Sequence, residues 1–189
     1  MIRIGILGDI GSGKSFVAKS FGYPVFNADN EVGILYRKNK KIFIKLNKAL
    51  PKHITEFPIK KQEITRTILA NKNSLKKIIK IIHPEIRKRM NIFIKKNKKK
   101  KLIVLDIPLL LENKINRKKD ILIFVESKKG EILKRLKKRK NFDKQIINKF
   151  RKIQLPLDYK KKKSEFIIKN NFTNRFIKKQ IKCILEQIH

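Results

Sequence analysis

Residues 8–15 read GDIGSGKS and match the pattern G-x-x-x-x-G-K-[ST] at every fixed position. The apolar run at residues 2–7 is typical of a buried strand, and apolar residues at near-helical spacing follow the motif in residues 15–21. Between a strand and a helix, a glycine-rich turn can fold around phosphate with its backbone N–H groups pointing inwards. The stretch therefore predicts a binding site for a nucleoside triphosphate.

Two side chains of this motif are expected to carry its chemistry. Lys14 should reach the β- and γ-phosphates, where its charge can follow the transferring group. Ser15 should place its hydroxyl on the Mg²⁺ ion that accompanies ATP. The motif occurs in switches, motors and small-molecule kinases, so the acceptor has to be sought elsewhere in the chain.

Apolar runs alternate with helical patterns along the sequence. The runs predict strands at residues 2–7, 23–26, 102–105, 121–125 and 166–168, and a helical spacing predicts helices at 129–140 and 175–188. From residue 31 to about 97 the spacing is helical, with breaks expected at Pro51, Pro58 and Pro84. Strands that alternate with helices indicate an α/β fold with a parallel sheet covered on both faces.

The charge is unusual for a chain of 189 residues, because 51 Lys and Arg against 15 Asp and Glu give a net +36. Such a charge favours phosphate-rich partners. However, 41 lysines face only 10 arginines and are spread along the chain, and Ile, Asn and Phe are also abundant, as expected of codons rich in A and T. We expect no specific nucleic-acid partner, although a basic nucleic-acid-binding protein with an ATP switch is an alternative.

Several protein classes are disfavoured by what the sequence lacks. Cys183 is the single cysteine, so no internal disulfide or thiolate zinc site is expected. The longest apolar stretch, residues 102–111, is far shorter than the roughly 20 residues of a membrane-spanning helix. We therefore expect a cytoplasmic protein with no membrane partner.

The acceptor is expected near Asp29. A guanine-specific [NT]-K-x-D sequence after an apolar strand is absent, which disfavours a GTPase. Asp29 follows the second predicted strand and so lies at the edge of the sheet that also holds the phosphate loop. A carboxylate there suits either of two roles: it can accept a proton from an attacking hydroxyl, or it can cap the following helix.

Five segments together resemble the dephospho-CoA kinase family. In chain order they are GDIGSGKS, FNADN (26–30), IIHPEIR (81–87), VLDIPLLLE (104–112) and a basic helix ending KRLKKR (134–139), followed by Gln154-Leu155-Pro156. The resemblance runs over nearly the whole chain and implies a P-loop kinase with a five-stranded parallel sheet flanked by helices, plus a helical substrate domain and a lid. It implies phosphorylation of the ribose 3′-hydroxyl of dephospho-CoA by Mg²⁺ and ATP, the last step of coenzyme A synthesis.

The resemblance also implies a division of the chain and a set of site residues. Residues 1–30 and 97–189 would form the P-loop core, with the lid at about 128–163, and residues 31–96 would form the CoA-side domain. The protein would act on ATP and dephospho-CoA as a monomer. The ATP-binding residues would be Gly11, Ser12, Gly13, Lys14, Ser15 and Phe16.

Catalysis would fall to Lys14, Asp29 as the base and the lid residue Arg139, with Arg135 beside it in the lid. Asp106 would lie beside the phosphate loop and help to order Mg²⁺ through water. Asp29, Asp106 and His83 would contact the substrate, although capping or packing before the proline suits His83 equally well.

Three single positions and one three-residue segment depart from the family pattern. Phe16 stands where Thr is usual, Lys61 where an arginine is expected, and Phe150 where an arginine often precedes Gln154 by four residues, with Arg151 one place later. The family's A-D-Y segment reads Ser164-Glu165-Phe166. Because of these departures, an enzyme that has lost activity is one alternative. Another is a P-loop kinase with a different small acceptor, which would differ in the acceptor pocket of residues 31–96.

Overall fold

The computed structural model describes residues 1–71, 73–138 and 142–188. The chain divides into two compact units. The P-loop unit comprises Met1–Asn27 and Lys96–His189, and the helical unit comprises Ala28–Lys95. None of the described helices combines the length and the apolar composition that crossing a membrane requires.

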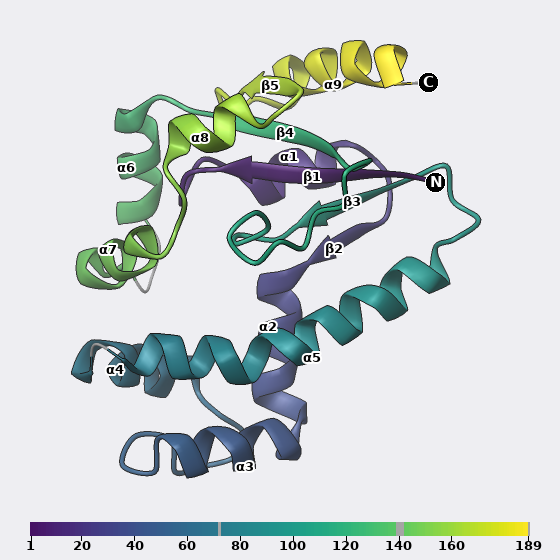
Figure 1. Cartoon of the computed structure of the whole chain (residues 1–189). Helices are drawn as coiled ribbons and strands as arrows, with labels where there is room; N and C mark the ends of the chain where they lie inside the picture. The colour runs from purple at the N-terminus through teal and green to yellow at the C-terminus, as the bar shows by residue number, and fades with distance from the viewer. Residues whose placement is uncertain (72, 139–141, 189) are drawn as a thin grey trace. The chain divides into compact units, whose positions relative to one another are not determined.

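The P-loop unit is built on a sheet of five parallel strands, which confirms the predicted fold class. Their spatial order is β2-β3-β1-β4-β5, with β1 in the centre (Figure 1). The carboxyl end of β1, where the P-loop begins, is thus flanked by the ends of β3 and β4. The bounds are β1 (Ile2–Gly8), β2 (Val25–Asn27), β3 (Leu102–Asp106), β4 (Ile121–Glu126) and β5 (Phe166–Lys169).

Five helices of the same unit are described: α1 (Lys14–Ser20), α6 (Lys129–Lys137), α7 (Lys144–Lys152), α8 (Leu157–Lys162) and α9 (Asn174–Ile188). α1 and α9 pack together, and their buried residues form one apolar core with alternate residues of β1, β3 and β4. This alternation arises because successive side chains of a strand point to opposite faces. Burial of both faces makes the strands read as continuous apolar runs.

The opposite face of β1 is covered by the segment after β3 and by α8. A side chain at Gly5 would place its Cβ 2.5 Å from Leu110 Cδ2 and 2.9 Å from Leu122 Cδ2, so this position has no room for one. α8 also packs against β1 and carries the buried Lys160. This face therefore brings Leu110 and α8 against the strand that leads into the P-loop.

The helical unit consists of α2 (Ala28–Lys38), α3 (Lys40–Ala49), α4 (Lys61–Ala70) and α5 (Ser74–Lys96), the last of which ends at the unit boundary. The expected break at Pro84 is wrong, because Pro84 lies inside the 23-residue α5. Residues on both sides of it, including Ile78, Ile82 and Ile86, are buried along one face. Their burial offsets the hydrogen bond that a proline cannot donate.

Candidate active site

The motif GDIGSGKS forms the turn between β1 and α1. β1 ends at Gly8 and α1 begins at Lys14, while Gly11 and Gly13 both adopt φ of +87°, a conformation that side chains rarely tolerate. At Gly13 a Cβ would lie 2.2 Å from Asn170 Nδ2 and 2.8 Å from Phe172 Cε1. Only glycine fits there, so the motif's third glycine is required by close packing as well as by φ.

Two neighbouring strands hold the turn in place. The carbonyl of Ser12 accepts hydrogen bonds of 2.8 Å from Ser127 Oγ and from Asn170 Nδ2. Ser127 and Asn170 directly follow β4 and β5, at the carboxyl edge of the sheet. Neither residue was predicted from the sequence, where each is a polar residue two positions after the end of a predicted strand.

Lys14 turns its amine back over the loop. Its Nζ donates to the Asp9 carbonyl at 2.7 Å and to the Gly8 carbonyl at 3.2 Å. Phosphate oxygens are stronger acceptors for an ammonium group than neutral carbonyls. The amine is thus held within reach of a phosphate bound in the loop.

Asn27 connects Ser15 with Asp106. Asn27 and Asp106 are register partners at the ends of β2 and β3, and Asn27 Nδ2 donates to Asp106 Oδ2 and to Ser15 Oγ. Asp106 is buried and Ser15 is exposed. No group of three or more His, Cys, Asp or Glu residues in the described ranges is arranged to hold a metal. One hydroxyl with a nearby carboxylate nevertheless fits Mg²⁺, which takes its other ligands from phosphate and water.

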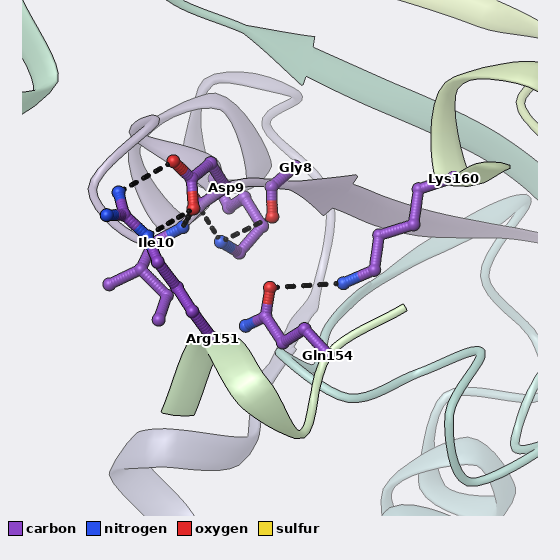
Figure 2. A network of polar contacts seen from close by, with 7 residues as sticks. Gly8, Asp9, Ile10, Arg151, Gln154 and Lys160 are labelled. Carbon is purple, nitrogen blue, oxygen red and sulfur yellow. Dashed lines mark hydrogen bonds and ion pairs between the residues drawn. The ribbon is translucent and has the colours of Figure 1, made fainter. Parts of the chain in front are cut away.

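Arg151 reaches the P-loop from the last turn of α7. Its Nη2 lies 3.0 Å from Asp9 Oδ2 and its Nε 3.4 Å from Asp9 Oδ1, a two-point contact of guanidinium and carboxylate (Figure 2). Asp9 Oδ1 also accepts the N–H of Ile10 at 2.7 Å. The structure thus brings Arg151, which sequence analysis named only as a departure from the family pattern, to the turn that carries Lys14.

Beside this contact lies a buried ion pair. Lys160 Nζ is 2.6 Å from Glu112 Oε1 and donates to Gln154 Oε1 at 3.3 Å, the second contact being visible in Figure 2. Glu112 Oε1 also accepts the N–H of Leu155 at 3.0 Å. The Glu112 carboxylate thus contacts Lys160 and the backbone of Leu155, whereas the Asp106 carboxylate contacts Asn27.

Helix α6 packs against the P-loop. A Cβ at Gly11 would lie 2.9 Å from Leu136 Cγ and 3.0 Å from Ile132 Cγ2. Arg135, on the same helix, stacks its guanidinium 4.1 Å from the ring centre of Phe172. The predicted catalytic residue Arg139 lies outside the described residues.

The remaining predicted positions are divided between the two units. Phe16 packs its ring partly against the apolar core of the P-loop unit. Asp29 and His83 belong to the helical unit, Asp29 as the exposed second residue of α2 and His83 half-buried on α5. Lys61 is the exposed first residue of α4.

Comparison with known proteins gives one consistent result. A family model described as dephospho-CoA kinase matches residues 2–175. The dephospho-CoA kinase of Wolbachia pipientis wMel is 34% identical to this chain over 98% of it and 97% of the relative. Two solved structures share the fold: a Thermus thermophilus protein (TM-score 0.74, 24% identity, 100% of this chain and 98% of that one) and the Campylobacter jejuni dephospho-CoA kinase (TM-score 0.62, 22% identity, 98% and 96%).

Proposed function

The chain belongs to the dephospho-CoA kinase family, and we propose that its P-loop residues bind the ATP from which it phosphorylates dephospho-CoA. The chain is an ATP-dependent kinase, and its product is coenzyme A. The family match over residues 2–175, together with an intact GDIGSGKS turn between β1 and α1, carries this conclusion. In the reaction the ribose 3′-oxygen bonds to the γ-phosphorus, the bond from that phosphorus to the β,γ-bridging oxygen breaks, and the hydroxyl loses its proton.

Lys14 exchanges the carbonyls of Gly8 and Asp9 for phosphate oxygens when ATP binds. The amine already lies 2.7 Å from the Asp9 carbonyl, so the exchange requires a small movement of a flexible side chain. The backbone N–H groups of residues 11–16 hold the phosphates, with Gly11 and Gly13 supplying the required φ. Lys14 then stabilises the charge that develops on the transferring group.

Asp29 accepts the proton of the 3′-hydroxyl and orients that hydroxyl for in-line attack. Asp29 is an exposed residue in the first turn of α2, directly after β2. The helical unit, His83 included, binds the CoA part of the substrate. The lid at residues 128–163, with Arg139, completes the site on the ATP side.

Ser15 would hold the Mg²⁺ ion that enters with ATP, and Asp106 would help to order it through water. The contacts of Asn27 with both side chains support this pairing. Mg²⁺ supplies charge neutralisation to the phosphates. We propose that the protein is a cytoplasmic monomer without a specific nucleic-acid partner.

The test is an assay of ADP release with Mg²⁺ and ATP, in which dephospho-CoA is compared with nucleoside monophosphates and RNA. We expect turnover with dephospho-CoA alone and a product heavier by one phosphate. Turnover with another acceptor only would contradict the substrate assignment. Salt-dependent RNA binding that stimulates ATP hydrolysis would instead favour the nucleic-acid switch.

Two variants probe the proposed roles. We expect Asp29→Asn to lower kcat by about 10²–10⁴-fold with nearly unchanged ATP affinity, because the amide cannot accept the proton. Lys14→Ala should cost at least as much, since it removes charge stabilisation from the transition state. Asp158→Asn and Lys19→Ala are the matched controls, each changing the same residue type at an exposed helical position. Near-normal turnover in Asp29→Asn would remove Asp29 from the role of base.

A further inference from the structure

Lys160 and Glu112 form an ion pair that is costly to bury. Their side chains are 1% and 9% exposed, and Glu112 Oε2 is buried without a hydrogen-bond partner among the described residues. Lysine is almost never fully buried unless it is paired, and an apolar pair of similar volume is often at least as stable. Stability alone therefore does not account for these two residues.

What the pair holds is the turn between α7 and α8. Lys160 donates to the side chain of Gln154 at 3.3 Å, and Glu112 accepts the backbone N–H of Leu155 at 3.0 Å. One buried charge pair thus fixes two successive residues of the turn. Both partners are anchored, Lys160 on α8 and Glu112 in the segment after β3 that covers β1.

Arg151 is three residues before Gln154 and is coupled to the same turn. The N–H of Gln154 donates to the Arg151 carbonyl at 3.1 Å. The Arg151 guanidinium contacts the Asp9 carboxylate, while the Asp9 carbonyl accepts from Lys14 at 2.7 Å. The position of the turn therefore sets where the guanidinium stands relative to Lys14.

We infer that Lys160 and Glu112 are positioning residues for phosphoryl transfer, because their pair holds Arg151 where it meets the phosphates of ATP. The inference rests on the proposed function and adds three residues to it. Phosphate oxygens offer Arg151 the same two-point acceptor that the Asp9 carboxylate offers. Phe150, at the position where the family often has an arginine, carries no charge. In this chain the phosphate contact is therefore made by Arg151, one position later.

A double-mutant cycle tests this inference. We expect Arg151→Ala to lower kcat by about 10²-fold, as removal of one preorganised donor does. Lys160→Met should lower kcat by about 10–100-fold through misplacement of that donor, with the KM for dephospho-CoA unchanged. In the Arg151→Ala background the same Lys160→Met change should cost less than about twofold, because the group it positions is gone.

Two further variants separate positioning from folding. Lys160→Met/Glu112→Leu removes both charges, so no unpaired charge is left buried and the protein stays folded. It should nevertheless be at least as slow as Lys160→Met, since the turn has lost both contacts. Lys161→Met is the matched control: Lys161 is the neighbouring lysine of α8, half-exposed and paired with Glu126 at 2.7 Å, and its loss should leave kcat within about twofold.

The outcomes are distinct. A wild-type protein that makes no coenzyme A would overturn the proposed function and this inference together. An active wild-type protein would overturn the inference alone in either of two cases. In one, Lys160→Met costs the same factor with and without Arg151; in the other, Lys160→Met/Glu112→Leu keeps full kcat.

Discussion

Arg3–Asp120 and Lys160–Glu112 are both buried ion pairs of the P-loop unit, but the first connects two parts of the sheet and the second holds the turn between α7 and α8. Arg3 Nη2 lies 2.9 Å from Asp120 Oδ2, and Asp120 also accepts the N–H of Arg117 at 2.9 Å. That pair ties the start of β1 to the turn before β4. Arg3 is five residues before Gly8, about 17 Å along an extended strand. The same kind of ion pair therefore stabilises the sheet at Arg3–Asp120, which we call the frame pair, and positions Arg151 at Lys160–Glu112.

The Arg3–Asp120 pair also shows what burial costs. Burial lowers the pKa of Arg3, despite the favourable charge of Asp120. Burial likewise raises the pKa of Asp120, and it outweighs the hydrogen bond from Arg117 and the charge of Arg3. Both shifts have one cause: removal from water penalises each charge by more than the partner returns.

The largest expected difference between the two pairs is the loss of stability when the Arg3–Asp120 pair is broken. Arg3→Met leaves the Asp120 carboxylate buried without its ionic partner and should lower the free energy of unfolding by about 3–5 kcal/mol. Urea unfolding measures the loss. At a temperature where the variant is folded, kcat should stay within about twofold of the wild type. A larger fall would show that the Arg3–Asp120 pair also affects catalysis, as is proposed for Lys160–Glu112.

A smaller effect is expected when both frame charges are removed. Arg3→Met/Asp120→Leu should unfold within about 1–2 kcal/mol of the wild type, because both desolvation penalties disappear and the lost acceptor of the Arg117 N–H costs about 1 kcal/mol. The variant should also retain kcat, whereas Lys160→Met/Glu112→Leu should be stable and slow. A loss equal to the sum of the two single variants would contradict this expectation.

The smallest effect is a pH dependence. Because the pKa of Asp120 in the folded protein is raised from 3.8, the native state holds this proton more tightly than the unfolded chain does. The resulting stability is fully present below pH 3.8 and is lost as the pH rises through the folded pKa. Asp120→Asn cannot titrate there. The free energy of unfolding of the wild type minus that of Asp120→Asn should therefore increase as the pH falls from 6 to about 4. A decrease in this difference would show that the charges of Arg3 and Arg117 lower the pKa of Asp120 by more than burial raises it.

The P-loop was predictable because its requirements are local. Gly11 and Gly13 are needed for φ, and Lys14 folds back on residues within six positions of itself. The parallel sheet was also predictable, since burial of both faces leaves uninterrupted apolar runs. The expected break at Pro84 failed because burial along the whole of α5 outweighs the local cost of one proline.

The rest of the candidate site had weaker signals. Asn27 stands in a quoted motif, yet its link to Asp106 depends on the register of β2 with β3. Asn170 is one polar residue after a short strand, and its contact with Ser12 spans 158 positions. Arg151 and Lys160 lie among many other basic residues, so nothing local marks them out.

The sequence by itself determined the α/β fold, the phosphate-binding turn and the family resemblance, because these depend on residue spacing and on backbone requirements within short segments. Beyond Lys14, which the motif already marks, only the tertiary structure decided which of the 51 basic residues lie beside the P-loop. It buries Lys160 against Glu112 and brings Arg151 to Asp9 across 142 positions. Burial and long-range contact, which turn one lysine among many into a fixed charge, are properties of the packed chain.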